Sequence, residues 1–290
     1  MQMRPSTYWL SACLAVAAFA GLPVVAAADE TDFCIKQSDE LAVSVCSRAI
    51  ETQQYTGRSL ARLYARRGGA YQAHGDLDRA EADFNESMRV DPTYPSAYLN
   101  RGVNWYRRGD LDRAIADYDQ AIRLDPKYEV AYANRGAAWG TKGDFGRAIA
   151  DFNEAMRLDP NDADAIYGRG LVWGRKGDLD RAIADYDQTI RLDPNHVAAY
   201  VNRGGAFGHK GDLDRAIADF GEAIRLDPKG AQAYYNRGVA WEMKRDLQKA
   251  LADLKMFSRL APSDLDGRKA MERVQKKLSA RERSLERGPG

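Results

Sequence analysis

Histidine and cysteine are scarce in this chain, and neither sign of charge is in excess. The 290 residues include three His and three Cys, which argues against a His/Cys metal centre or a disulfide-dense scaffold. The 43 basic and 42 acidic side chains leave a formal net charge of +1, so we expect no nucleic-acid partner. With 44% hydrophobic and 29% charged residues, wholesale disorder and a multi-pass membrane protein are excluded.

Motifs for catalysis are also missing. The glycines do not have the spacing of a phosphate-binding loop, and no Ser or Asp pairs with a His at an interpretable spacing. His196 and His209 lie at opposite ends of one expected helix, about 20 Å apart, so they cannot share a metal. We therefore expect a protein that is not an enzyme and that has no cofactor and no metal.

A long uncharged run is confined to the N-terminus. Residues 8–28 contain no charged side chain, and the small residues Ala26 and Ala28 end the run. This layout is typical of a signal peptide over residues 1–28, cleaved near Ala28, and predicts an exported, periplasmic protein. An uncleaved N-terminal membrane anchor is the alternative. Lipidation at Cys13 is disfavoured, because too short an apolar run precedes it.

Removal of residues 1–28 would leave two cysteines, Cys34 and Cys46. An even pair in an exported chain predicts one disulfide between them. Two buried thiols are the alternative, since free cysteine is a frequent core residue.

A period of 34 residues organises most of the remaining chain. The sequence from Gly109 to Tyr118 recurs from Gly177 to Tyr186, and related copies lie between and after them. In every unit position 8 is Gly, position 20 is Ala and position 32 is Pro, and positions 4, 11 and 24 are mostly aromatic. The six contiguous units are 61–94, 95–128, 129–162, 163–196, 197–230 and 231–264.

Each unit predicts two short amphipathic helices, because its apolar and small columns recur at helical spacing. Gly-Asp at positions 15 and 16 predicts the turn between the two helices. Pro at position 32 predicts the end of the second helix. No unit can bury its apolar face alone, so the units must stack. The expected fold class is therefore an all-α solenoid.

These columns resemble the tetratricopeptide repeat family over residues 61–264. The resemblance implies a right-handed superhelix whose first helices line a concave groove for a protein partner. The last unit departs from the pattern at Arg245, Leu254 and Phe257, as a terminal unit with a different neighbour should.

Helical caps are expected at both ends of the repeats. Residues 29–60 form the N-terminal cap, with a helix over 38–50 whose apolar stripe contains Leu41, Val45, Ala49 and Ile50. Residues 265–290 form a C-terminal capping helix and tail. The basic excess of residues 265–287 leaves open a second function, in which this helix contacts anionic lipid as a membrane-surface adaptor.

Two polar columns carry opposite charges. Position 7 is Arg and position 23 is Asp in all six units. Their matched numbers predict a ladder of ion pairs between helices. Recognition of an anionic partner by the Arg column is the alternative.

Position 6 is the candidate for partner binding. The resemblance implies that it faces the groove, and a carboxamide can both donate to and accept from a peptide backbone of any sequence. Local hydrogen bonding is the alternative. Gly168 interrupts the column, and the neighbouring position 5 is mostly apolar. The candidate residues are Asn100, Asn134, Asn202 and Asn236, with Leu99, Tyr167, Val201 and Tyr235 beside them.

The glycines at position 12, Gly140, Gly174 and Gly208, each cost about 1 kcal/mol relative to Ala in a helix interior. Opening of the groove for close backbone approach is one explanation, and fraying of the helix end is the other. Position 5 has no Lys and position 9 no Asn, so the family's carboxylate clamp is not implied. The sequence thus predicts a non-catalytic scaffold in the cell envelope that holds an extended peptide or a partner protein.

Overall fold

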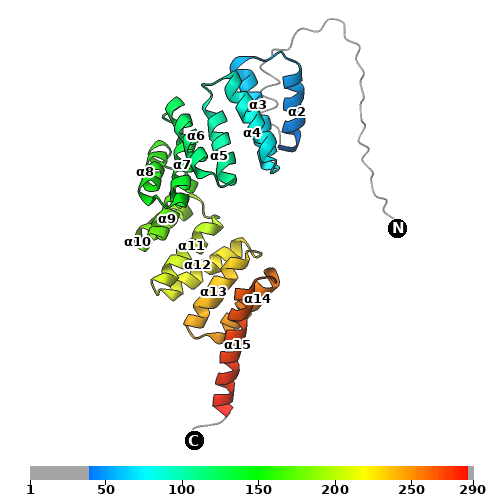
Figure 1. Cartoon of the computed structure of the whole chain (residues 1–290). Helices are drawn as coiled ribbons and strands as arrows, with labels where there is room; N and C mark the ends of the chain where they lie inside the picture. Colours follow the sequence, from blue (N-terminus) through cyan, green and yellow to red (C-terminus); the bar gives the residue numbers. More distant parts are fainter. Residues whose placement is uncertain (1–38, 287–290) are drawn as a thin grey trace, which may run out of the picture.

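Residues 39–286 are described by a computed structural model, and they form a stack of α-helices without a β-strand (Figure 1). The predicted signal peptide and Cys34 lie outside the described residues, so export, cleavage and the Cys34–Cys46 disulfide stay predictions. The helices are α2 (Asp39–Glu51), α3 (Gly57–Ala73), α4 (Leu77–Val90), α5 (Pro95–Arg107), α6 (Leu111–Leu124), α7 (Glu129–Lys142), α8 (Phe145–Leu158), α9 (Ala163–Lys176), α10 (Leu179–Leu192), α11 (Val197–His209), α12 (Leu213–Leu226), α13 (Ala231–Met243), α14 (Leu247–Leu260) and α15 (Leu265–Glu286).

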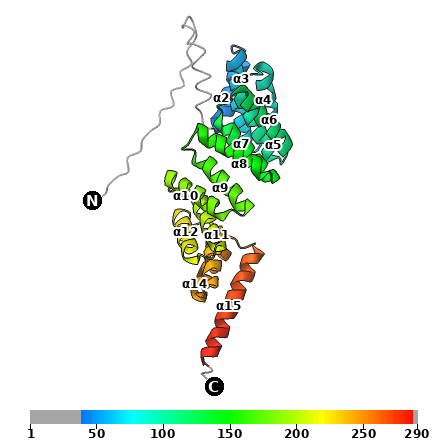
Figure 2. The ribbon, with the colours of Figure 1, turned by 90° about the vertical axis from the view of Figure 1, so that its left-hand side faces the viewer.

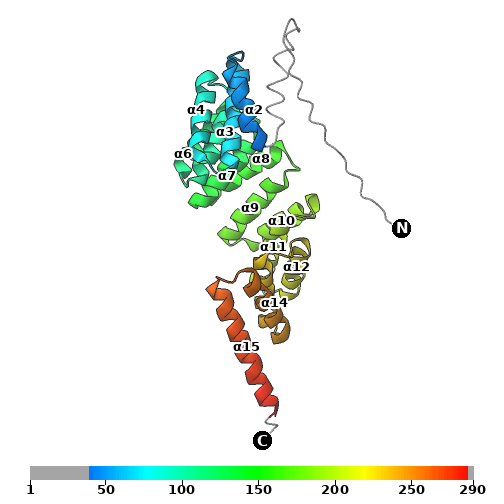
Figure 3. The ribbon, with the colours of Figure 1, turned by 90° about the vertical axis from the view of Figure 1, so that its right-hand side faces the viewer.

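The helices from α3 to α14 form six antiparallel pairs, one for each 34-residue unit. Each pair packs on the next, and the first helices of neighbouring units also touch one another. Two further views show that the pairs follow one another along an elongated, curved stack with α15 at its end (Figures 2 and 3). The expected all-α solenoid is confirmed.

Glycine at position 8 lets the two helices of a unit approach each other. A Cβ atom on Gly102 would lie 2.5 Å from Cε1 of Tyr118, the aromatic residue at position 24, and one on Gly204 would lie 2.8 Å from Cε1 of Phe220. Separations below about 3 Å are tighter than side chains tolerate, so only glycine fits there. The glycine column at position 8 therefore sets how closely the two helices of a unit pack.

The turn within each unit is built from the predicted Gly-Asp pair. Gly109 has φ +80°, a left-handed conformation in which glycine carries no steric cost. The carboxylate of Asp110 then accepts a hydrogen bond from the Arg113 backbone N–H at 3.0 Å and caps the second helix. In the last unit Arg245 adopts φ +63° at the glycine position, which strains this one turn.

Within residues 39–286, one helix packs on each end of the stack. Helix α2 packs on α3 through the small residues Ala42, Cys46 and Ala49, which are buried, whereas Leu41 is 53% exposed. Ala49, Val45 and Ile50 of the predicted stripe lie in or against this cluster, whereas Leu41 does not, and Ala42 and Cys46 are buried in addition. At the other end, Val274 of α15 is buried against α14. Within residues 39–286 no helix combines the length and the apolar character that a membrane crossing needs.

Candidate binding groove

Two pockets lie side by side along the first helices of the fourth, fifth and sixth units. The first pocket, of about 230 Å³, lies between α9, α10 and α11. The second, of about 460 Å³, lies between α11, α12 and α13. Gly205 and His209 of α11 line both, so the two pockets form one continuous depression, which we call the α9–α13 groove.

The two pockets are equivalent in the repeat frame. Each is lined by positions 9, 12, 13, 17 and 24 of one unit and by positions 6, 9, 10 and 13 of the next. Their walls are therefore mostly apolar, with one asparagine in each. The first pocket is lined by Leu171, Gly174, Arg175, Leu179, Ala182, Tyr186, Asn202, Gly205, Ala206 and His209. The second is lined by Gly205, Gly208, His209, Leu213, Phe220, Tyr235, Asn236, Val239, Ala240 and Met243.

The glycines of α11 in this groove are not required by packing. A Cβ atom on Gly205 would have nothing within 4 Å, and one on Gly208 would meet only Cβ of Ala216, at 3.9 Å. Each glycine in a helix interior costs about 1 kcal/mol relative to Ala, and no contact within the protein offsets that cost. Their effect is to leave the floor of the groove open and its backbone accessible.

The equivalent place one unit earlier, between α7 and α9, is filled by the protein itself. There a Cβ atom on Gly140 would lie 3.1 Å from Cγ2 of Val172, and one on Gly168 would lie 2.6 Å from Cε1 of Phe152. Gly168 thus interrupts the asparagine column because the Phe152 ring occupies the space that a side chain would need. The position-12 glycines therefore differ in role: Gly140 accommodates packing, whereas Gly208 opens the groove.

Three of the predicted asparagines make local side-chain hydrogen bonds, and two of them line the groove; Asn236 Oδ1 accepts from Gln232 Nε2 at 2.8 Å. Asn134 Nδ2 donates to the Val130 carbonyl at 2.8 Å, one helical turn back. Asn202 Nδ2 donates to the Ala198 carbonyl at 2.9 Å and also to the Tyr167 hydroxyl at 2.8 Å. These bonds orient the carboxamides of Asn134 and Asn202. Asn202 lines the first pocket and Asn236 the second, and Asn100 and Asn134 do not line either of them.

The four apolar neighbours at position 5 lie in different surroundings. Tyr235 lines the second pocket, with its ring 5.1 Å from that of Phe257. Tyr167 is half-buried, and its ring lies 4.6 Å from that of His196. Burial raises the pKa of its hydroxyl, whereas the hydrogen bond from Asn202 lowers it. Val201 is half-buried, and Leu99 is only 6% exposed, inside the core around α5 and α6.

Sequence reasoning missed several positions of the groove wall, among them positions 13 and 17. Position 17 contributes Leu213, and position 13 contributes His209 and Met243. Met243 is 58% exposed, unusually much for a large apolar side chain. A signal was present: position 13 varies strongly among the units, as a column that faces a ligand rather than the core would. Its residues in units two to six are Arg107, Thr141, Arg175, His209 and Met243.

An ionic cluster joins α13 to α15 beyond the second pocket. The carboxylate of Glu242 accepts hydrogen bonds from Arg273 Nη2 at 2.7 Å and from Lys277 Nζ at 2.8 Å. These bonds, with Arg273 first, lower the pKa of Glu242 to about 2. The cluster therefore keeps its charges at neutral pH, and it ends the apolar stretch of the groove.

The Arg and Asp columns form the predicted ladder. In each of the six units the guanidinium of Arg binds the carboxylate of Asp through two hydrogen bonds, as in Arg135 to Asp151 at 2.8 and 2.7 Å. A third bond reaches position 25 of the preceding unit: Arg135 Nη1 donates to Asp119 at 2.5 Å. The ladder is therefore structural. The other pairs are Arg67–Asp83, Arg101–Asp117, Arg169–Asp185, Arg203–Asp219 and Arg237–Asp253.

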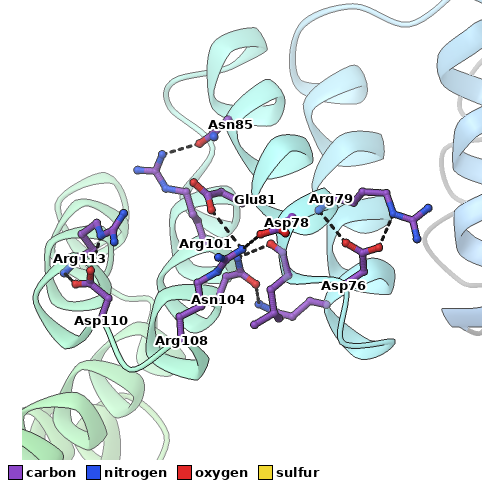
Figure 4. A network of polar contacts seen from close by, with 12 residues as sticks. Asp76, Asp78, Arg79, Glu81, Asn85, Arg101, Asn104, Arg108, Asp110 and Arg113 are labelled. Carbon is purple, nitrogen blue, oxygen red and sulfur yellow. Dashed lines mark hydrogen bonds and ion pairs between the residues drawn. The ribbon is translucent and has the colours of Figure 1, made fainter.

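The hydrogen bond from the position-7 arginine to the preceding unit recurs along the ladder, and it is absent in the last unit. Arg101 Nη1 donates to Asn85 Oδ1 at 2.7 Å, and nearby Arg108 pairs with Asp78 across the same two units (Figure 4). In the last unit the corresponding position is Gly221, which offers Arg237 no side chain. Neighbouring units are thus connected by charged hydrogen bonds as well as by apolar packing.

Within the described residues, no group of three or more His, Cys, Asp or Glu side chains is arranged to hold a metal ion. His196 is used locally, since its Nδ1 accepts a hydrogen bond from the Ala199 backbone N–H at 3.1 Å.

Comparison with known families agrees with this architecture. Models of the tetratricopeptide repeat match residues 61–94, 140–197, 174–221 and 201–264, and a model described as TPR repeat matches residues 104–143. The chain belongs to the tetratricopeptide repeat family. This fold is an interaction scaffold that generally binds protein or peptide partners. No curated protein matches the chain.

Several solved structures resemble the solenoid. The crystal structure of the APC/C hetero-tetramer Cut9–Hcn1 has a TM-score of 0.66 at 16% identity, over 86% of this chain and 55% of that chain, and shows the fold alone. YrrB, described as a TPR protein with an unusual peptide-binding site, has a TM-score of 0.53 at 26% identity, over 65% of this chain and 97% of that one. MamA has a TM-score of 0.51 at 30% identity, over 57% and 96%.

Proposed function

We propose that this chain is an exported, non-catalytic scaffold of the bacterial cell envelope that holds an extended segment of a partner protein in the α9–α13 groove. The observation that carries the proposal is the pair of equivalent pockets with an open glycine floor. A ligand in an extended conformation presents side chains at regular intervals, and a repeat structure presents pockets at regular intervals.

The composition of the groove supports a peptide ligand. The apolar walls supply binding energy through burial of apolar side chains. Asn202 and Asn236, which line the two pockets, supply polar groups that can pair with a peptide backbone. The unfilled space above Gly205 lets that backbone approach closely. The peptide-binding site in the description of YrrB, 26% identical to this chain, is consistent with this use of the fold.

Affinity capture from cell envelopes tests the proposal, with the mature chain as bait. The matched variants are Gly205→Leu, which fills the groove, and Gly69→Leu, which alters position 9 of the first unit. A Cβ atom at either glycine meets nothing within 4 Å, so both variants should fold, as circular dichroism would verify. A partner that is retained by Gly69→Leu and lost by Gly205→Leu binds in the groove. Equal retention by both variants would place binding elsewhere.

The asparagine column has its own test. The fourfold variant Asn100→Ala, Asn134→Ala, Asn202→Ala and Asn236→Ala should release the partner if the carboxamides hold its backbone. The pair Asn202→Ala and Asn236→Ala should then account for most of the loss, since only these two line the pockets. Retention by the fourfold variant would make the column structural.

Export requires a separate measurement. Mass spectrometry of the protein from the cell envelope should find a chain that begins near Asp29 and loses two hydrogens' mass through a Cys34–Cys46 disulfide. An intact N-terminus would instead support the uncleaved anchor.

The membrane-surface alternative has less support. The apolar stripe of α15, with Ala270 and Val274, is buried against α14 and is not available for insertion into lipid. Binding to anionic vesicles that is abolished in a Lys269→Gln, Lys276→Gln variant would revive this alternative.

A further inference from the structure

The two pockets of the α9–α13 groove occupy equivalent places but differ in chemistry at position 24. The first pocket is lined by Tyr186 and the second by Phe220. Both side chains are only 3% exposed, so each belongs to a pocket wall rather than to the outer surface. The first pocket therefore has a hydroxyl at the place where the second has the edge of a phenyl ring.

The Tyr186 hydroxyl has no hydrogen-bond partner within residues 39–286. Because no side-chain oxygen or nitrogen of this part of the chain is both fully buried and unpaired, the hydroxyl must reach an accessible space. A Cβ atom on Gly174 would lie 3.5 Å from Tyr186 Oη, and both residues line the first pocket. The hydroxyl is thus directed into the first pocket, beside its glycine floor.

This hydroxyl makes the first pocket selective. Burial raises the pKa of Tyr186, so the hydroxyl keeps its proton at neutral pH and can donate. A ligand side chain that fills the pocket displaces water from the hydroxyl. If that side chain has no acceptor, it leaves a buried hydroxyl unpaired, which costs free energy. The pocket therefore favours a side chain that can accept a hydrogen bond from Tyr186.

Asn202 adds an acceptor to the same pocket. Its Nδ2 group donates to the Ala198 carbonyl and to the Tyr167 hydroxyl, so both amide hydrogens are used. The Oδ1 atom is then the part of the carboxamide that can contact a ligand. The first pocket thus offers one donor, from Tyr186, and one acceptor, from Asn202. A ligand group with one acceptor and one donor satisfies both.

A primary carboxamide has this combination at the end of a side chain. Leu171, Leu179 and Ala182 line the same pocket and suit the methylene groups of such a side chain. A carboxylate fits less well, because it needs several donors and one of the two protein groups is an acceptor. Arg175 also lines the pocket, but it is exposed and its Nη1 donates to the Gly140 carbonyl at 3.2 Å. The first pocket therefore favours a neutral, hydrogen-bonding side chain.

The second pocket favours a large apolar side chain. Its volume is about 460 Å³, against about 230 Å³ for the first. Phe220 and Ala240 are buried in its wall, and burial of apolar surface against them is favourable. Its polar lining residues, His209, Tyr235 and Asn236, are exposed or half-buried, so none of them places a buried, unpaired group in the wall.

We propose that the α9–α13 groove binds a segment of a partner protein with a glutamine or asparagine side chain in the first pocket and a large apolar side chain in the second. The Tyr186 hydroxyl donates to the carboxamide oxygen, and the carboxamide nitrogen donates to Asn202 Oδ1. This inference rests on the proposed function and specifies the ligand of the same groove.

A peptide panel tests the pair of side chains. Each fluorescent peptide has one Gln and one Phe in a background of Ala and Ser, in either order. None to about eight residues separate the two, an extended reach of up to about 30 Å, so no spacing is assumed. We expect fluorescence anisotropy to find one order and spacing that bind most tightly. In that peptide Phe→Ala should weaken binding about tenfold, and Gln→Met, which keeps the length but removes the hydrogen bonds, should also weaken it about tenfold.

Variants at position 24 separate the hydroxyl from the packing. Tyr186→Phe removes only the oxygen and should abolish the preference for Gln over Met. Tyr118→Phe is the matched control, because Tyr118 has the same position in the second unit, is 1% exposed and lines neither pocket of the groove. It should leave the preference unchanged. Phe220→Tyr places a hydroxyl in the second pocket, so this variant should lose less binding than the wild-type chain when the peptide Phe is replaced by Gln.

Several outcomes would overturn the inference. They are equal binding of the Gln and Met peptides, a preference for Gln that persists in Tyr186→Phe, and the absence of binding by any peptide of the panel at millimolar concentration. Tighter binding of a Glu peptide than of the Gln peptide would also overturn it and would indicate an ion pair with Arg175.

The fate of the proposed function is measured separately with Gly205→Leu. If this variant loses the peptides or the captured partner while the Gln preference fails its test, the groove remains the binding site and only the ligand pattern is wrong. If Gly205→Leu affects neither the peptides nor the captured partner, both proposals fail.

Discussion

Replacing Arg135 with alanine should lower the stability of the solenoid markedly. The guanidinium binds Asp151 through two hydrogen bonds and Asp119 through a third. The Asp151 side chain is 10% exposed, so the substitution leaves a nearly buried carboxylate without its partner. Loss of one partner from such a pair costs about 3 kcal/mol, which corresponds to about 6–12 °C in melting temperature for a chain of this size.

Arg237→Ala is the matched comparison. Arg237 binds Asp253 in the same two-bond geometry, at 2.8 Å for both bonds, but it lacks the third bond because position 25 of the preceding unit is Gly221. Arg237→Ala should therefore cost about 0.5–1 kcal/mol less than Arg135→Ala. This difference is small because the third partner of Arg135, Asp119, has a side chain that is 38% exposed, so its ion pair is weak.

The assay is thermal and urea unfolding of the mature chain, followed by circular dichroism at the helical band. The difference between the two variants isolates the bond that connects neighbouring units. If Arg135→Ala melts with the wild-type chain and instead loses a captured partner, the structural assignment of the Arg column is refuted.

Three further predictions concern the end of the stack. Gly267→Ala should detach α15, because the added Cβ would lie 1.8 Å from Cε1 of Phe257 and overpacking costs about 2–3 kcal/mol. Faster amide exchange in that helix would show the detachment, and unchanged exchange would contradict it. Arg245→Gly should raise the stability by about 0.5–1 kcal/mol by relieving the left-handed strain at φ +63°, and a lower melting temperature would show that the arginine contributes a contact worth more than the strain. Glu242 has a pKa lowered from 4.5 to about 2 in the folded state, so its stabilisation is complete above pH 4.5 and is lost as the pH falls toward 2. Because the cationic partners are half exposed, that loss should be about 1–2 kcal/mol. Urea midpoints at pH 5 and pH 2.5 measure it, and the Glu242→Gln variant should lose less stability between these two pH values than the wild-type chain. An equal loss in both proteins would show that the cluster is not the cause.

The repeat columns were enough to predict the fold and most of its internal contacts. Glycine at position 8 faces the residue at position 24, aromatic in five units and Leu254 in the last, and Arg at position 7 faces Asp at position 23 in every unit. Such contacts join residues that are sixteen positions apart in a fixed helical hairpin, so the same residue types recur wherever the hairpin recurs. The predicted helix ends and turns followed for the same reason, since their capping residues are local.

The binding groove was only partly predictable. The asparagine column indicated the correct face, and the position-12 glycines were recognised as unusual. The sequence did not distinguish Gly140 from Gly208, because that difference depends on Val172, a residue of the next unit. Met243 was missed because position 13 varies among the units. Leu213 was missed although position 17 is Leu in five of the six units, because a constant apolar column is equally typical of the core.

What the sequence determined by itself was therefore the unit and its repetition: two helices, their turn, their internal ion pair and the order of six copies. Only the tertiary structure decided where the surface is open. Whether a glycine marks an empty pocket or a tight contact depends on which side chain of a neighbouring unit fills the space above it. The Phe152 ring fills the space beside Gly168, whereas no side chain fills the space above Gly205. Between α13 and α15, Glu242 pairs with Arg273 and Lys277, so that part of the surface is charged. These outcomes are set by shape and charge across units, which a periodic sequence pattern does not contain.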